Sequence, residues 1–368
     1  MSTIVKIIAI LIFVVVASYI TINVTKVIFN KVAGGITDDG ASVKVDKKPC
    51  NLPKTEREFK SESYYSGPLI DSHVHFPTSS KIVSSIAEKN GLQMPVLEGD
   101  LSADKLICLF ESEGIIKTFG FHITSKFAEG SAVSAAKEIE ESYPGKIIHF
   151  LMPPPVLSLN VEPSGIEGIL NKNKGLFKGF GEVGFYMDSY EGAKPDDPNF
   201  LEIYKLAEEH NLIVMIHPAE SQELSTEKVL KEFPKVTFLI HGGDNEEWIM
   251  SLMKKYPNFY YSLDANITSL YGYKKEHQFQ KFTKEEYLSY IRTNFDAVLD
   301  KALSKWKGRI EVNPDRFTWG TDRWFAWQFD PEVGGIVEEF GRSFIGRLNP
   351  SVQEKFAYKN VEKMLQER

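Results

Sequence analysis

Two histidines stand two positions apart in the run Pro68-Leu-Ile-Asp-Ser-His-Val-His-Phe76. Residues two apart on a strand face the same side, so a strand here would let His73 and His75 offer two imidazole nitrogens to one ion. Neutral imidazole suits Zn²⁺ and related divalent metals. A His-x-His pair also occurs on ordinary polar surfaces, so its meaning depends on what the rest of the chain carries.

Four further histidines and carboxylates interrupt other apolar runs at or near their C-terminal ends. They are Glu182 in Gly179-Phe-Gly-Glu-Val-Gly-Phe185, His217 in Val214-Met-Ile-His-Pro218, His241 in Phe238-Leu-Ile-His-Gly-Gly243 and Asp322 in Thr318-Trp-Gly-Thr-Asp-Arg323. A buried polar residue needs a partner. One metal site at which all six groups converge supplies a partner for each of them.

The elements that must position these groups alternate along the chain, as short β-rich apolar runs separated by stretches with apolar residues at helical spacing. The runs are 69–76, 116–123, 147–152, 177–186, 212–217, 236–241, 259–263 and 317–321. This alternation predicts a parallel sheet.

Eight strand–helix units fit a closed (β/α)8 TIM barrel, which typically takes about 250 residues and places its active site at the C-terminal ends of its strands. An open, doubly wound sheet is the alternative. It usually has fewer strands and would carry a Gly-rich phosphate turn after the first strand, where this chain has His73-Val-His75.

The N-terminus differs in kind, because Ile4 to Ile22 is almost entirely apolar. A helix needs roughly 20 residues to cross a bilayer. We expect 1–29 to be an uncleaved membrane anchor, with a cleaved secretory signal as the alternative. Residues 30–66 are polar and are predicted to be a linker. The domain 67–368 is then expected outside the cytoplasm, periplasmic or extracellular, and anchored to the membrane or else secreted.

The composition of the 368 residues, 42% hydrophobic and 25% charged, is that of a globular protein. A net charge of −7 with no basic tract argues against nucleic acid as a partner. The expected partners are a small-molecule substrate and a membrane, with oligomerisation left open. The two cysteines cannot form a disulfide framework or a thiolate zinc site. Cys108 is expected to be a plain core cysteine, and Cys50, in the linker, to have no role.

As an ordered set, these motifs resemble the amidohydrolase superfamily, most closely its amidohydrolase-related branch of metal-dependent hydrolases. The resemblance extends from about Pro68 to Leu365. Its motifs are Ile70-Asp-Ser-His-Val-His75, Gly181-Glu-Val-Gly184, Ile216-His-Pro218, Ile240-His-Gly-Gly243 and Trp319-Gly-Thr-Asp322. Many members carry a carboxylated lysine on the fourth strand. The glutamate found there in this chain is similar to that of TatD-like hydrolases.

The resemblance implies a role for each position. Metal ligands are expected on the first, fifth and eighth strands, at His73, His75, His217 and Asp322. Asp322 is also expected to accept a proton from the metal-bound water. His241 ligates a second metal in two-metal members and polarises the substrate in one-metal members. Glu182 is predicted to be a further ligand, so one ion and two ions remain alternatives. The expected ion is Zn²⁺, with Mn²⁺ or Mg²⁺ as alternatives.

Other residues near the strand ends are candidates for substrate contacts: Tyr186, Trp324, Arg323 and His122. Arg323 would bind a carboxylate or phosphate with both ends of its guanidinium group, or else form a salt bridge. Asp71 is predicted to be a structural hydrogen-bond acceptor beneath the site. The long segment 266–314 is expected to include an extra helix and to act as a lid.

The function predicted from these residues is hydrolysis of an ester, lactone, amide or related bond of a small molecule by a metal-activated water. One alternative is a metal-dependent, non-oxidative decarboxylase of the same superfamily. The other is a membrane-tethered barrel that binds a ligand and catalyses nothing.

Overall fold

The computed structural model describes residues 50–76, 101–126, 129–154, 157, 160–187, 190, 192–242, 246–264 and 283–366. These residues belong to one compact unit, Lys47–Arg368. The predicted membrane segment 1–29 and the first part of the predicted linker, 30–49, lie outside the described residues. Within the described ranges, no helix is both long enough and apolar enough to cross a bilayer.

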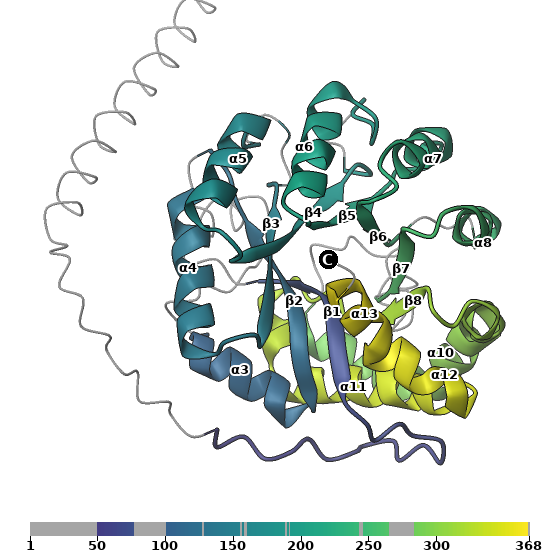
Figure 1. Ribbon diagram of the computed structural model, residues 1–368. Coiled ribbons are helices and arrows are strands. Elements are labelled where there is room, and N and C mark those ends of the chain that lie inside the picture. Colours follow the sequence, from purple (N-terminus) through teal and green to yellow (C-terminus); the bar gives the residue numbers. More distant parts are fainter. Residues whose placement is uncertain are drawn as a thin grey trace, which may run out of the picture. The chain divides into compact units, whose positions relative to one another are not determined.

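Eight parallel strands follow one another in chain order around a barrel, and each pairs with the next (Figure 1). They are β1 (Leu69–His75), β2 (Ile115–Ile123), β3 (Ile147–Met152), β4 (Phe177–Gly184), β5 (Ile213–His217), β6 (Thr237–Ile240), β7 (Phe259–Leu263) and β8 (Phe317–Trp319). Each apolar run of the sequence contributes one strand, and the predicted (β/α)8 TIM barrel is confirmed.

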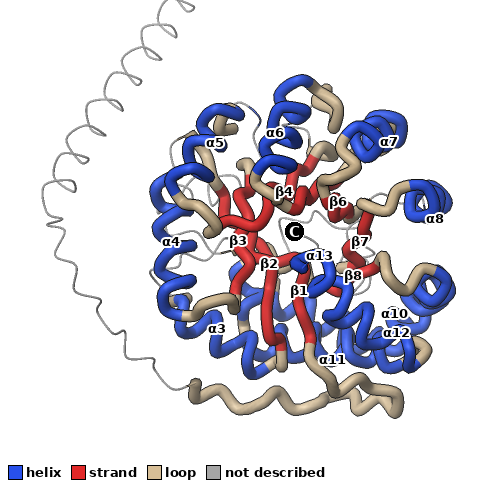
Figure 2. The backbone as a smooth tube through the Cα atoms, viewed as in Figure 1, coloured by secondary structure: helices blue, strands red, loops and turns tan. Residues whose placement is uncertain are grey.

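Helices connect the strands, and most of them form an outer ring around the barrel, while the last helix lies across one of its ends (Figure 2). They are α3 (Ala103–Ser112), α4 (Glu129–Ser142), α5 (Pro163–Lys172), α6 (Pro198–Glu209), α7 (Glu223–Glu232), α8 (Glu246–Lys255), α10 (Lys284–Val312), η5 (Ala326–Phe329), α11 (Pro331–Gly346), α12 (Pro350–Glu354), η6 (Lys355–Lys359) and α13 (Asn360–Gln366). The helix expected within 266–314 is α10, which Thr283 and Glu286 begin with reciprocal capping bonds. Residues 265–282, the rest of the proposed lid, lie outside the described residues.

The strands separate two cores, because alternate side chains point to opposite faces of the sheet. The outer core lies between the sheet and the helices. The inner core fills the barrel and includes Phe119 and Phe121 of β2. Val361 and Met364 of α13 belong to the inner core together with Ile70, at the start of β1. The last helix therefore covers the end of the barrel opposite the predicted site.

The barrel closes where the candidate ligands lie. The backbone N–H of Asp322 donates to the carbonyl of His73, and the N–H of His75 donates to the carbonyl of Arg323, both at 2.8 Å. Val74 and Arg323 form the only bridge recorded between β1 and the chain after β8 among the described residues. The contact that joins the first strand to the last thus also holds the first-strand and eighth-strand ligand positions side by side.

The described part of the predicted linker, 50–66, packs against the barrel instead of extending from it. The buried carboxylate of Glu339 on α11 accepts hydrogen bonds from the backbone N–H groups of residues 58–60, at 2.6 to 3.1 Å. The ring of Phe59 stacks on Phe295 of α10 with centroids 3.8 Å apart. The folded domain therefore begins before the boundary at 67 that the polar composition suggested.

Cys50 and Cys108 form a disulfide, with Cα atoms 5.1 Å apart. The expectations of an unpaired core cysteine at 108 and of no role at 50 are wrong. Cys108 is only half-buried at the edge of the apolar face of α3, so its thiol can be reached by the passing segment. A cross-link over a separation of 58 residues stabilises the fold by about 4 kcal/mol if loop entropy dominates.

Candidate metal centre

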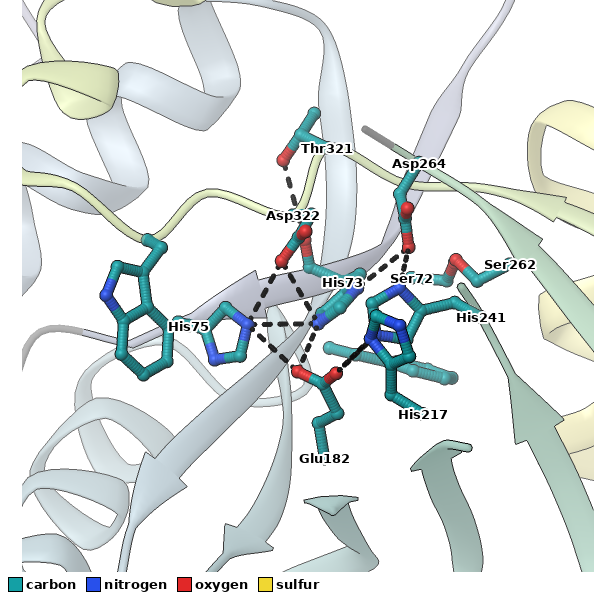
Figure 3. A network of polar contacts seen from close by, with 12 residues as sticks. Ser72, His73, His75, Glu182, His217, His241, Ser262, Asp264, Thr321 and Asp322 are labelled. Atoms are coloured by element: carbon teal, nitrogen blue, oxygen red, sulfur yellow. Dashed lines mark hydrogen bonds and ion pairs between the residues drawn. The ribbon is translucent and has the colours of Figure 1, made fainter. Parts of the chain in front are cut away.

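The two histidines of β1 meet the aspartate that follows β8, as Figure 3 shows. The Nε2 atoms of His73 and His75 lie 3.1 Å apart. Asp322 Oδ1 lies 3.1 Å from His75 Nε2 and 3.4 Å from His73 Nε2. Three atoms that can each donate a lone pair to a cation therefore converge at one point.

Glu182 lies between these residues and a second pair of histidines (Figure 3). Its Oε2 is 3.4 Å from His73 Nε2 and 3.3 Å from His75 Nε2. Its Oε1 is 3.1 Å from His217 Nδ1 and also contacts His241 Nε2. One buried carboxylate thus faces two histidine pairs, one with each oxygen.

All six predicted ligands are brought together at the C-terminal ends of their strands. They fall into overlapping groups of potential ligand atoms within 4.8 Å of one another: His73, His75, Glu182 and Asp322; His73, His241, Asp264 and Asp322; Glu182, His217 and His241. Glu182 is common to the first and third groups.

A bulge in β4 turns Glu182 into the barrel. The pairing of β4 with β5 shifts register between Phe180 and Val183, and both of these residues belong to the outer core. Gly181 has φ +116°, and a Cβ there would lie 2.1 Å from the carbonyl oxygen of Met215. Only glycine fits this backbone, so the Gly before Glu182 is part of how the carboxylate is aimed.

A second glycine makes room for His217. Gly242 has φ +70°, and a Cβ there would lie 1.9 Å from His217 Nε2. The residue that follows His241 must therefore lack a side chain if the fifth-strand imidazole is to reach Glu182. This contact explains the His-Gly pair at the end of β6.

Asp71 supports the first and last ligand positions from below. Its carboxylate accepts bonds from the backbone N–H and the hydroxyl of Thr321, at 2.9 and 2.6 Å, and from the N–H of His73, at 3.1 Å. This is the structural acceptor role predicted for it. Asp322, which follows Thr321, adopts φ +53°, a region that Asp tolerates better than most residues. The bonds of its neighbours, Thr321 to Asp71 and Arg323 to His75, hold it in this conformation.

Asp264, the first residue after β7, is part of the cluster and was not among the predicted ligands. Its Oδ2 lies 2.8 Å from His73 Nδ1 and 3.1 Å from His241 Nδ1, and the residue is fully buried. The signal that marks the other ligands was present, since Asp264 directly follows the apolar run 259–263.

Charge governs the cluster because its three carboxylates are all largely withdrawn from water. Burial alone would lower the pKa of His73, but Asp322, with Asp264 and Glu182, raises it to about 9. Burial alone would raise the pKa of Glu182, but His241 and the bonded histidines hold it well below its usual range. The carboxylates raise the pKa of His73 and His241 against the effect of burial, so the site attracts positive charge.

This donor set fits divalent cations. Imidazole nitrogens and carboxylate oxygens are the ligands of catalytic zinc sites. A metal-binding histidine commonly donates its other ring N–H to a carboxylate, and Asp264 occupies that place for His73. Asp264 Oδ1 has no hydrogen-bond partner among the described residues, so Oδ2 makes the contacts of this carboxylate with the two rings.

Arg323 does not point into the site. Its guanidinium group is 1% exposed and makes two bonds to the carboxylate of Glu113, at 3.1 and 2.6 Å. The salt bridge, which was the alternative prediction, is the interaction the structure shows. A guanidinium group whose two terminal nitrogens are bound in this way is not available to a substrate, so the substrate-binding prediction is corrected.

His122 also lies away from the site, although it sits near the end of β2. Its neighbours Phe121 and Ile123 fill the inside of the barrel, so His122 faces the helices. There its Nε2 bonds His149 Nδ1 of β3 at 2.8 Å, and both residues are buried. The expectation that His122 lines the pocket is wrong because it assigned the residue to the wrong face of the strand.

Two aromatic side chains flank the metal centre. The ring of Tyr186, after β4, lies 4.0 Å from the ring of His217, and Tyr186 is 45% exposed. The ring of Trp324, after Asp322, packs edge-on against His75 with centroids 4.2 Å apart. Both predicted substrate contacts are thus next to ligands, and Tyr186 reaches solvent.

The chain matches a family model described as amidohydrolase over residues 70–366. None of the curated proteins compared with it is a match. Among solved structures it is similar to an amidohydrolase from Burkholderia multivorans with bound HEPES (15% identity, TM-score 0.52, covering 82% of this chain and 99% of that one). It is also similar to an uncharacterized TIM-barrel protein from Bordetella bronchiseptica (14% identity, TM-score 0.51, 82% and 99%). At these identities the structural matches show the shared fold.

Proposed function

The chain belongs to the amidohydrolase superfamily, whose members bind a divalent metal, and on that basis we propose that it is a hydrolase of a small-molecule ester, lactone, amide or related bond. The observation that carries the proposal is the position of Glu182. Its two carboxylate oxygens face two separate histidine pairs at the mouth of the barrel.

Two ions fit this arrangement better than one. A first ion would be held by His73, His75 and Asp322 and a second by His217 and His241, and each of these histidine pairs faces one oxygen of Glu182. The histidine and carboxylate donors favour Zn²⁺, with Mn²⁺ or Mg²⁺ as alternatives. Such ions lower the pKa of water towards neutrality and polarise the carbonyl oxygen of a substrate.

Asp322 is the residue placed to move protons. Its side chain is 12% exposed, compared with 3% for Glu182 and 0% for Asp264. Burial alone would raise its pKa, but the charge of His73 and the bond from His75 lower it. It therefore stays ionised at neutral pH, where it accepts a proton from the attacking water and passes it to the leaving group.

Tyr186 and Trp324 form the walls on either side of the ligands. An apolar wall with a few polar groups is the usual lining of a small-molecule site. In this proposal Tyr186, which reaches solvent, contacts the substrate outside the metal centre, and Trp324 holds the ring of His75 in place.

The test is to load the purified full chain with zinc or manganese, count the bound metal by elemental analysis, and assay panels of esters, lactones and amides. We expect about two equivalents of metal, and turnover that Asp322→Asn reduces by about 10³-fold or more. Fewer than about a tenth of an equivalent in the loaded chain would exclude a metal centre. Metal with release of CO₂ from carboxylic acids, and no hydrolysis, would support the decarboxylase instead. Metal without any turnover would favour the ligand-binding barrel.

We further propose that the domain works outside the cytoplasm, held by the N-terminal apolar segment or released by its cleavage. The disulfide between Cys50 and Cys108 supports this proposal, because such bonds persist mainly in oxidising compartments. Alkylation of the protein in intact cells, followed by mass spectrometry, should find both thiols blocked from reaction. Free thiols at both positions would contradict the proposal.

A further inference from the structure

We propose that Asp264 is a positioning residue that fixes the proton of His73 and His241 on Nδ1, so that both rings present Nε2 to the metal. The inference rests on the proposed function, since it concerns how the metal ligands are oriented. It assigns a role to the residue after β7, which the ordered motifs of the sequence do not include.

The geometry places Asp264 behind two imidazoles at once. A single oxygen, Oδ2, lies 2.8 Å from His73 Nδ1 and 3.1 Å from His241 Nδ1. The two rings come from β1 and β6 and meet edge to face with centroids 4.4 Å apart. An ionised carboxylate only accepts hydrogen bonds, so His73 Nδ1, which is hydrogen-bonded to Oδ2, carries the proton. His241 Nδ1 lies within ion-pair distance of the same oxygen and makes no hydrogen bond among the described residues. For this ring it is the negative charge of the carboxylate that favours a proton on Nδ1.

The opposite edges of the same two rings face the metal centre. His73 Nε2 lies 3.4 Å from Glu182 Oε2, and His241 Nε2 contacts Glu182 Oε1. The two rings are therefore held between an outer carboxylate from β7 and an inner one from β4. Because an imidazole binds an ion through one nitrogen, a proton fixed on Nδ1 leaves the Nε2 lone pair directed at the cations.

Asp264 also couples the two proposed ion positions. In the proposed assignment His73 binds the first ion and His241 the second, yet both rings face the same oxygen of Asp264. Carboxylates in this place raise the basicity of the histidine and fix its orientation, and their loss typically weakens metal binding by 10- to 100-fold. A single substitution at 264 should therefore weaken both ions together.

Asp264→Asn in the full chain tests this role, because the amide keeps the shape and an oxygen that both rings can reach but removes the negative charge that favours a proton on each Nδ1. Metal affinity is measured for each ion by competition with a chelator, and stoichiometry by elemental analysis. We expect the same number of bound ions as in the wild type, each held about 10- to 100-fold more weakly. Ser262→Ala is the matched control. Ser262 lies on β7, two residues before Asp264, and its buried hydroxyl is bonded to Ser72 of β1 at 3.0 Å. Its removal should leave both affinities unchanged.

Two results with this variant would overturn the proposal. Loss of one whole equivalent of metal in Asp264→Asn would make Asp264 a ligand, and unchanged affinity for both ions would leave it without a role. The apoprotein labelled with ¹⁵N-histidine, titrated to an alkaline pH at which both rings have lost one of their two protons, gives a reading that needs no variant at 264. The resonances lost in His73→Asn and His241→Asn should be those of rings protonated at Nδ1, and unprotonated Nδ1 atoms would refute the assignment. A wild-type chain that binds no metal would remove the proposed function, and the ¹⁵N spectra would still decide the position of the protons.

Discussion

Two clusters of buried histidines occur in this barrel, and the pKa values of His73 in one and of His149 in the other are shifted in opposite directions. The mouth cluster comprises four histidines and three carboxylates, His73, His75, His217, His241, Glu182, Asp264 and Asp322. The outer pair, His122 and His149, lies between the sheet and the helices. His122 lies near the end of β2 and His149 near the start of β3, and the histidines of both clusters are largely shielded from water. The difference between them is the charge of their surroundings.

In the outer pair, burial dominates. It lowers the pKa of His149 to about 4, and it lowers that of His122 well below the ordinary value, with a further contribution from His149. The carboxylate of Glu140 lies 3.7 Å from His149 but is half in solvent. Carboxylates at the mouth raise the pKa of His73 to about 9 against the same effect of burial. A buried histidine is thus a core residue or part of a cation site according to the acids that accompany it.

The largest contrast should come from removing the carboxylate that both ion groups share. A structural zinc site of four ligands binds with about 10–16 kcal/mol, or about 2.5–4 kcal/mol per ligand. We therefore expect Glu182→Gln to weaken metal binding by about 10²- to 10³-fold, measured by chelator competition. His149→Leu, the matched change in the outer pair, should leave metal content unaltered. Equal losses in both variants would erase the distinction between the clusters.

Acid should destabilise the protein through the outer pair. The pKa of His149 is about 4 in the folded chain and about 6.5 when unfolded. Between these values the unfolded chain binds a proton that the folded chain excludes, so stability falls as the pH drops from 6.5 to 4, by about 3 kcal/mol for this group. Urea titrations at several pH values should show a shallower loss in His149→Leu. Parallel curves for the two proteins would mean that His149 titrates as it does in water.

A substitution that crowds the metal centre but leaves every ligand residue unchanged should have a smaller effect. A methyl group at Gly242 would overlap the ring of His217, so Gly242→Ala should displace that ligand and weaken the second ion by about 10- to 100-fold. The same measurement on Gly168→Ala is the control, because a Cβ there meets nothing within 4 Å. An unaltered affinity in Gly242→Ala would show that His217 does not need its present position.

The smallest effect is expected when the outer pair is broken at neutral pH. His149→Leu leaves His122 Nε2 buried without its partner at 2.8 Å. An unsatisfied buried polar atom costs about 1–3 kcal/mol, and the added apolar contact offsets part of it, so we expect a loss of about 1 kcal/mol in urea unfolding. A loss above about 4 kcal/mol would mean that this pair is as critical as a metal ligand.

Much of the fold could be read from local pattern. Strands such as 147–152 and 259–263 were predicted with the ends that the structure gives them, because each is an apolar run between polar turns. The position of 50–66 could not be predicted in this way. Its polar composition resembles a linker, and only the buried carboxylate of Glu339 and the half-buried thiol of Cys108, both distant in sequence, hold it against the barrel.

The candidate site was predictable as a set of residue types at the C-terminal ends of strands, since parallel strands bring those ends together. The direction of each side chain was not. Glu182 faces inward because of a bulge at Gly181, and His122 faces outward because its strand has none there. Arg323 follows a ligand directly, yet its guanidinium group is held by Glu113, 210 positions away.

The sequence by itself therefore determined the alternation of eight strands with helices and the order of the metal-binding residue types at the strand ends. Both can be read from local patterns along the chain. The tertiary structure decided how those residues combine. It placed Glu182 between two histidine pairs, set Asp264 behind two rings and moved His122 and Arg323 out of the site. These outcomes depend on contacts between segments far apart in the chain and on strand bulges, and the spacing of residues along the sequence encodes neither.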